Sequence, residues 1–201
     1  MSGKNAVVRE IREWAITLIG AFVLVMLLNT KVFATTRVQQ SSMQDTLMEG
    51  QHLFVEKLTY NFVNPEKGDI IVFIENRSVS GFFDEINIFL TDVKEVFKPV
   101  DQKTNIRLVK RVIGTPGDQV DIKDGKVYIN GVAQEEPYVK GETNNRDFQL
   151  PVTVPYGKYF VLGDNRGVSK DSRVFGFIDR SQVEGKAVFR FWPFDKVGKL
   201  K

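Results

Sequence analysis

Residues 119–134, with the sequence QVDIKDGKVYINGVAQ, decide the fold class of this 201-residue chain. Lys123-Asp124-Gly125 and Asn130-Gly131 have the composition of tight turns, because Gly, Asn and Asp accept the backbone angles that such turns require. β-Branched and aromatic residues stand on both sides of the first turn, as in paired strands. The stretch therefore predicts an antiparallel hairpin with a second tight turn behind it.

Similar runs of β-branched and aromatic residues, separated by Gly, Pro, Asn and Asp, occur on both sides of this hairpin. They are HLFVEKLTY at 52–60, DIIVFIE at 69–75, IRLVKRVIG at 106–114, GKYFVLGD at 157–164 and KAVFRFWPF at 186–194. We predict a mostly β domain whose strands are chiefly antiparallel.

One segment inside this domain has a helical pattern instead. Between residues 82 and 97, apolar residues recur at helical spacing with charged residues between them, which predicts an amphipathic helix inserted over about 81–99. Its apolar side chains are Phe82, Phe83, Ile86, Phe89, Leu90, Val93, Val96 and Phe97. We expect this face to pack on the β domain, and the alternative is contact with the membrane or a partner.

The N-terminal region predicts a membrane anchor. Trp14 to Thr30 contains 17 residues without a charge, and Lys31 can extend its amine to the headgroups, so we place a transmembrane helix at 14–33. A cleavable signal peptide and a buried soluble helix are the alternatives. Basic residues before the span place residues 1–13 in the cytoplasm and residues 34–201 outside it, although Lys31 and Arg37 on the far side weaken this bias.

Composition narrows the possible chemistry. The 28 Lys and Arg against 25 Asp and Glu are spread along the chain, so nucleic acid is not an expected partner. The absence of cysteine and the single histidine, His52, exclude disulfides, Cys nucleophiles and multi-His metal sites. Catalysis would rest on hydroxyl, amine or carboxylate groups, and we expect no metal and no cofactor.

A serine and a lysine are the candidates for such chemistry. Ser42 follows the predicted anchor in a small polar turn, where a serine more often caps or turns the chain than attacks a substrate. Lys110 stands in the apolar run LVKRVIG at 108–114, and alternation puts it on one face with Leu108 and Val112. Either Lys110 faces solvent, or it is an amine kept neutral by burial for catalysis.

Four motifs, taken in order, make the chain resemble the bacterial type I signal peptidases, which are membrane-bound Ser/Lys peptidases of the LexA-like clan. They are SMQDTL at 42–47, GDIIVF at 68–73, KRVIGTPGD at 110–118, and GDNR at 163–166 followed by SKDSR at 169–173 and Gly176. With the anchor, the resemblance covers nearly the whole chain. It implies an antiparallel sheet or partly open barrel as the catalytic domain.

The resemblance also implies a role for each matching residue. Ser42 matches the nucleophile and Lys110 matches the general base that takes its proton. Ser169 matches the serine that orients the lysine amine, and Asp171 and Arg173 match the pair that holds that wall of the site together. Asp164 and Arg166 match nearby structural positions.

The resemblance also implies which residues would contact the substrate. The backbone N–H of Ser42 would donate to the oxyanion, and the apolar substrate pockets match Val38, Met43 and Val109. Two positions depart from the family pattern. Asp45 stands where a proline is usual, and Gln40 stands where a Ser or Gly is usual, so Gln40 either donates its amide to the oxyanion or leaves that donor missing.

The implied activity is an endopeptidase that removes signal peptides from exported preproteins at Ala-x-Ala sites, with preproteins and membrane lipid as partners. The alternative is a signal-peptidase-like assembly factor for a surface structure that cleaves nothing. A self-cleaving transcriptional regulator of the same clan is disfavoured by the anchor and by the lack of a DNA-binding segment.

Overall fold

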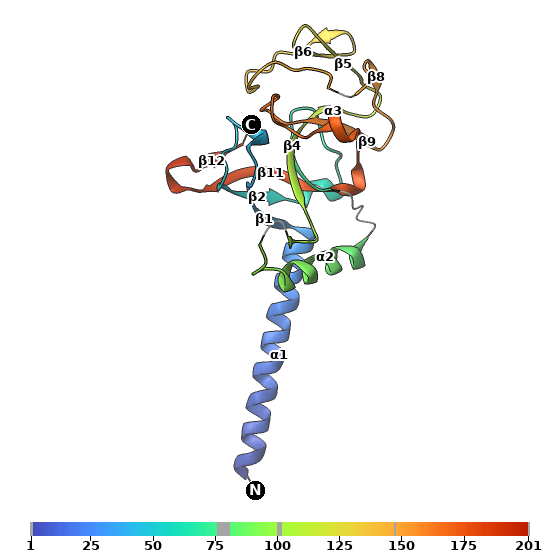
Figure 1. Ribbon diagram of the computed structural model, residues 1–201. Coiled ribbons are helices and arrows are strands. Elements are labelled where there is room, and N and C mark those ends of the chain that lie inside the picture. The colour runs from blue at the N-terminus through green and yellow to red at the C-terminus, as the bar shows by residue number, and fades with distance from the viewer. Residues whose placement is uncertain (1, 76–80, 100–101, 147, 201) are drawn as a thin grey trace.

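A long N-terminal helix extends away from a β domain in the computed structural model, which describes residues 2–75, 81–99, 102–146 and 148–200 (Figure 1). This helix, α1, spans Ser2–Lys31, and its part from Val7 to Lys31 is long and apolar enough to cross a membrane. The helix ends at Lys31 and Phe33 begins strand β1, so residues 32 and 33 of the predicted span lie beyond the helix. The backbone N–H of Lys57 donates to the carbonyl of Val32 at 2.9 Å, so pairing with the sheet ends the helix there.

The main sheet is antiparallel and open, with strand order β1-β2-β11-β3-β4-β9-β10, and β12 pairs with β11. Its strands are β1 (Phe33–Arg37), β2 (His52–Glu56), β3 (Ile70–Ile74), β4 (Arg107–Gly114), β9 (Lys158–Leu162), β10 (Ile178–Asp179), β11 (Val183–Trp192) and β12 (Gly198–Lys199). The mostly β, antiparallel fold class is confirmed, and both sheets are open.

The second sheet contains the predicted hairpin. It has the order β7-β6-β5-β8, from β5 (Gln119–Lys123), β6 (Lys126–Ile129), β7 (Val132–Ala133) and β8 (Val152–Thr153). Asp124 and Gly125 join β5 to β6 with φ angles of 50° and 74°, and Asn130 and Gly131 join β6 to β7 with 53° and 80°. Both predicted turns are confirmed, and the positive φ angles explain their residue types.

Three buried apolar clusters hold the domain together, and strand β4 contributes to each of them. Leu108 and Val112 pack with Phe73 and Val161. Val109 packs on a cluster that includes Met43, and Ile113 packs with Val120 and Phe160 of a third cluster. Because both faces of β4 are covered, the position of Lys110 between Leu108 and Val112 is rigidly defined.

The inserted helix, α2 (Phe82–Lys94), is confirmed as an element but packs differently from our expectation. It contacts α1, with the rings of Phe22 and Phe89 6.2 Å apart and Lys31 in an ion pair with Glu85 at 2.7 Å. Among the described residues, none from α2 belongs to the three apolar clusters. Phe83 is 80% exposed and Phe97, beyond the end of the helix, is 98% exposed. Ile88, by contrast, is buried, and with Phe89 and Val93 it lines the space between α2 and the main sheet. The helix therefore has one exposed side and one side toward the anchor and the β domain.

Short helical turns complete the chain. They are η1 (Ser41–Met43), η2 (Thr59–Asn61), α3 (Ser172–Phe175), η4 (Arg180–Gln182) and η5 (Phe194–Lys196). The turn η1 carries Ser42, and α3 follows the segment that contains Ser169 and Asp171.

Candidate active site

The fold brings Ser42 and Lys110 together from segments 68 residues apart in the chain. Ser42 lies in η1, and Lys110 extends from β4 so that its Nζ is 2.7 Å from the Ser42 Oγ. The serine is 7% exposed and the lysine 0%. Of the two readings that the sequence left open for Lys110, exposure to solvent is therefore wrong.

Burial changes the acidity of Lys110. Loss of water around the ammonium lowers its pKa from 10.5 to about 8, and the carboxylates of Asp171 and Glu75 oppose part of this decrease. The same nitrogen donates to the carbonyl of Val109 at 3.1 Å, which fixes its position beside the serine. A neutral amine at this distance can take the hydroxyl proton and so activate the oxygen as a nucleophile.

The segment Gly163–Asn165 holds η1 in place. The backbone N–H of Asn165 donates to the Ser42 carbonyl at 3.0 Å, and its side-chain amide donates to the Ser41 carbonyl at 3.2 Å. A Cβ on Gly163 would lie 2.4 Å from the Ser42 carbonyl oxygen and 2.2 Å from the Ser169 Oγ. Only glycine fits between these groups, so the backbone of this segment can approach the serine closely.

A buried ion pair supports the site from behind. Arg111, the neighbour of Lys110, donates from Nε and Nη2 to the two carboxylate oxygens of Asp164 at 3.0 and 2.8 Å. Asp164 also accepts from the Thr46 hydroxyl at 2.6 Å, so the pair links β4 to the chain just after η1. The roles of Arg111 and Thr46 were missed by sequence reasoning. The only available signal was the presence of both residues within the motifs.

Ser169, Asp171 and Arg173 lie in the same wall of the site, and each is at most 1% exposed. Asp171 pairs with Arg173 at 2.8 Å. Burial acts to raise the pKa of the Asp171 carboxyl, but the hydrogen bonds and charge of Arg173 outweigh it and lower that pKa. The Ser169 hydroxyl, expected to orient the lysine, makes no hydrogen bond to Lys110 among the described residues, and it lies near Asp171, where it helps to lower the pKa of that carboxyl.

Arg166 has a different partner from the neighbouring Asp164. It donates to Glu136 at 2.7 Å and to the Thr143 hydroxyl at 2.5 Å. These contacts connect the last motif to the loop between β7 and β8.

A small hollow of about 20 Å³ lies beside the serine. The three residues expected at the substrate pockets, Val38, Met43 and Val109, line it together with Gln40 and Ser42. Val38 and Met43 are buried, so the hollow has a firm apolar wall and little room. A shallow apolar hollow beside a nucleophile suits small side chains next to the bond that is attacked.

Of the two departures from the family pattern, Gln40 lines this hollow and Asp45 is not among its lining residues. Gln40 is exposed and precedes η1, and its side chain makes no capping hydrogen bond to that turn. Asp45 is also exposed and forms an ion pair with Lys140 at 3.0 Å. The Lys140 backbone in turn bonds to Asp164 and Arg166, which ties the turn after Ser42 to the last motif. Nothing in the sequence around Lys140 pointed to this contact.

Within the residues that the structure describes, no group of three or more His, Cys, Asp or Glu residues could hold a metal ion. His52 lies in β2 with its ring 5.8 Å from that of Phe191, a packing position in the sheet. The reactive groups that the fold brings together here are the Ser42 hydroxyl and the Lys110 amine.

The chain is similar in sequence to a family of known proteins. The family described as signal peptidase, peptidase S26, matches residues 11–192. Signal peptidase IB of Staphylococcus aureus (strain COL) is 36% identical over 94% of this chain and 93% of its own. Probable signal peptidase I-2 of Synechocystis is 34% identical over 92% of this chain and 74% of its own. A crystal structure of a signal peptidase I from Enterococcus faecalis is 34% identical, covering 62% of this chain and 97% of its own, with a TM-score of 0.40.

Proposed function

The chain belongs to the signal peptidase family, peptidase S26, and on that premise we propose that Ser42 and Lys110 are the residues that carry its reaction. It is a serine peptidase that cleaves signal peptides. The observation that supports the assignment is the 2.7 Å contact between the Ser42 Oγ and the buried Nζ of Lys110. No finding supports the alternative of a scaffold that cleaves nothing.

The proposed mechanism is acyl transfer in two steps. Neutral Lys110 takes the proton of Ser42 while Oγ attacks the scissile carbonyl, and the oxyanion accepts hydrogen bonds from the Ser42 N–H and the Gln40 amide. Lys110 then gives its proton to the leaving amine, which forms the new N-terminus of the mature protein. Water, activated by the same lysine, releases the signal peptide from Ser42. Val38, Met43 and Val109 favour small side chains, so we propose Ala-x-Ala cleavage sites.

A direct assay tests this function. The purified full-length protein should cut an Ala-x-Ala preprotein after the second alanine, as read from the mass of the mature product. A matched preprotein with a bulky residue such as Phe in place of that alanine should resist cleavage, because the hollow of about 20 Å³ has no room for it. Equal cleavage of both substrates would contradict the pocket assignment.

Cleavage should depend on pH through the lysine. Only the neutral amine can accept the serine proton, and burial sets the pKa of Lys110 at about 8. We expect kcat/KM to rise with pH through this region and to level off above it, since the neutral fraction increases as pH passes the pKa. Initial rates between pH 6 and 10 measure the profile, and a maximum on the acidic side would exclude a lysine base.

Gln40 offers a graded test of the oxyanion site. If its amide donates to the oxyanion, Gln40→Ala should lower kcat by about a hundredfold, the usual cost of one such donor. Gln40→Ser replaces the amide with the hydroxyl of the family pattern and should retain more activity than the alanine variant. Unchanged kcat in Gln40→Ala would leave the Ser42 N–H as the donor and remove Gln40 from the mechanism.

We propose that α1 crosses the membrane with residues 1–13 in the cytoplasm and residues 34–201 outside, where membrane lipid contacts the exposed phenylalanines near α2. The basic residues before the span and the apolar stretch Val7–Lys31 support this orientation. Protease added to intact cells stripped of their wall should digest the β domain and leave the N-terminal segment protected. Digestion only after the membrane is broken would reverse the topology.

A further inference from the structure

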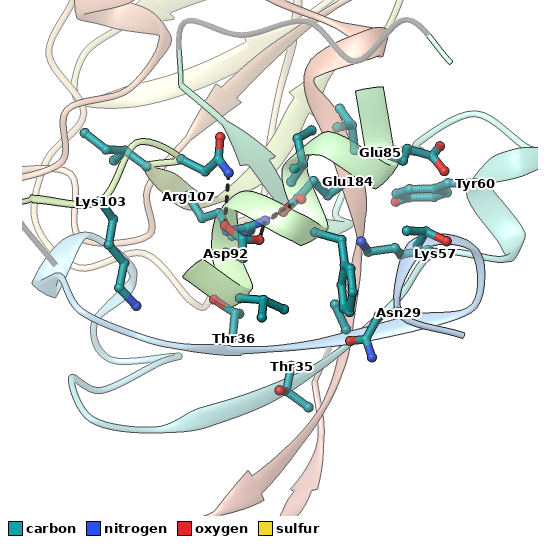
Figure 2. Close-up of a pocket in the computed structure, with 18 of the residues that line it drawn as sticks. Asn29, Thr35, Thr36, Lys57, Tyr60, Glu85, Asp92, Lys103, Arg107 and Glu184 are labelled. Carbon is teal, nitrogen blue, oxygen red and sulfur yellow. Dashed lines mark hydrogen bonds and ion pairs between the residues drawn. The ribbon is translucent and has the colours of Figure 1, made fainter. Parts of the chain in front are cut away.

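A second and much larger cavity, of about 580 Å³, lies between α2 and the main sheet. Figure 2 shows Thr35 and Thr36 of β1 on one side of it and Asp92 of α2 with Arg107 of β4 on the other. Asn29 and Thr30, near the end of the membrane helix, also line it. The cavity therefore begins at the level where α1 meets the β domain. Its volume is that of a typical binding site.

This cavity is adjacent to the hollow beside Ser42, because Arg37, Gln39 and Arg107 line both spaces. The two spaces lie in a row from the end of α1 to the serine, and we refer to them together as the path.

Two strand edges that have no strand partner among the described residues border this path. The backbones of Val32 and Val38 form hydrogen bonds to the segment paired with β1. Because bonding direction alternates along a strand, the backbone N–H and C=O groups of Thr35 and Arg37 point to the other side. No described strand lies beside β1 on that side. On β4, Ile106 and Val112 bond toward β3, so Arg107 and Val109 face away from it. Strand β9 pairs with β4 only from Arg111 onward. Such edges bind an extended peptide by main-chain hydrogen bonds.

We infer that the cavity under α2 binds the stretch of the signal peptide between its membrane-embedded core and the third residue before the cut. This inference rests on the proposed function. The substrate leaves the membrane beside α1 and must reach Ser42 in the direction in which β1 runs, from Phe33 to Arg37. An extended substrate advances one residue for each strand residue, so positions beyond the third before the cut lie beside Arg107 and Asn105.

The charges that line the cavity determine which charged residues it favours in a bound peptide. Arg107 holds Asp92 at 2.7 Å and Glu184 at 2.6 Å, and Lys31 neutralises Glu85. Within the described residues, Lys57 and Lys103 also line the cavity and form no ion pair with a carboxylate. The cavity lining thus carries five cations, Arg37, Lys57, Lys103, Arg107 and Arg180, against three carboxylates, Glu85, Asp92 and Glu184, so the site accepts acidic or neutral residues in this stretch and disfavours basic ones.

Charge reversal on both partners tests the inference. Three preproteins with the same Ala-x-Ala site would carry Glu-Glu, Ser-Ser or Lys-Lys at the fifth and sixth positions before the cut. With the full-length enzyme in phosphatidylcholine vesicles, we expect kcat/KM for the Glu-Glu substrate to exceed that for Lys-Lys by about fivefold to tenfold. Lys57→Glu/Lys103→Glu should reverse this order, because it changes the sign of the unpaired charge in the cavity.

Two controls separate this effect from general damage. Lys126→Glu changes an exposed lysine of the second sheet and should keep the wild-type order. A peptide that begins at the third residue before the cut does not reach the cavity, so all enzymes should cleave it at equal rates. Cleavage of the Ser-Ser preprotein shows that the proposed function holds whatever the charge preference is.

An unchanged order of the charged substrates in Lys57→Glu/Lys103→Glu would overturn the inference. Equal losses on the truncated peptide and the full preproteins would do the same, since they would show damage to the catalytic centre. If the double variant instead lost a stimulation by phosphatidylglycerol vesicles and kept the wild-type substrate order, the cavity would hold an anionic lipid headgroup, and the peptide assignment would be wrong.

Discussion

Ser42→Ala in the full-length protein should lower kcat/KM for preprotein cleavage by about a thousandfold or more, because it removes the proposed nucleophile. Lys110→Ala should have an effect of similar size, since the Nζ that lies 2.7 Å from the serine is then missing. Lys110→Arg should be equally inactive, because a guanidinium keeps its proton at any pH of the assay. The double variant Ser42→Ala/Lys110→Ala should lose little more than either single change.

These losses must come from chemistry and not from unfolding. Circular dichroism and thermal melting of Ser42→Ala should match the wild type, because removing one hydroxyl leaves the apolar clusters intact. For position 110, Lys110→Met is the matched control for folding, since it retains an unbranched apolar chain in a buried site. Substantial cleavage by Ser42→Ala, in a preparation free of host peptidase, would refute the assignment of the nucleophile.

Arg111→Met should destabilise the domain by about 3–5 kcal/mol, because it leaves the Asp164 carboxylate buried without its partner. Both side chains of this pair are almost fully inaccessible, at 2% and 0% exposure, and the pair also supports Thr46 next to the nucleophile turn. We therefore expect a lower urea midpoint and reduced activity in the same variant. Arg111→Met/Asp164→Leu should recover part of the stability, since no unpaired charge remains.

The matched control for this prediction is the ion pair between Lys158 and Asp179. Its atoms are 2.8 Å apart, as in Arg111 and Asp164, but its side chains are 38% and 46% exposed. Lys158→Met should cost at most about 1 kcal/mol, because water screens an exposed pair. Equal urea midpoints for Arg111→Met and Lys158→Met would show that the buried pair does not support the fold.

The local sequence determined the tight turns, the strands around them and the presence of the two long helices. The turns at Asp124-Gly125 and Asn130-Gly131 follow from the backbone angles that these residues accept, and the strands around them follow from residue type. The existence of α1 follows from an uninterrupted apolar stretch, and the existence of α2 follows from helical spacing. The candidate pair Ser42 and Lys110 came from a resemblance in ordered motifs, because on residue type alone each had a more ordinary explanation.

Only the tertiary structure decided which partners the side chains have. Whether Lys110 is buried depends on the packing around β4, and its lowered pKa follows from that burial and from no feature of its neighbours in sequence. The contacts of Arg111 with Asp164 and of Lys140 with Asp45 join residues far apart in the chain. The position of α2 against α1, with a cavity beneath it, also depends on how distant segments meet. Periodicity shows that a helix has an apolar face, but the surface that this face meets is set by the free energy of the whole packed molecule.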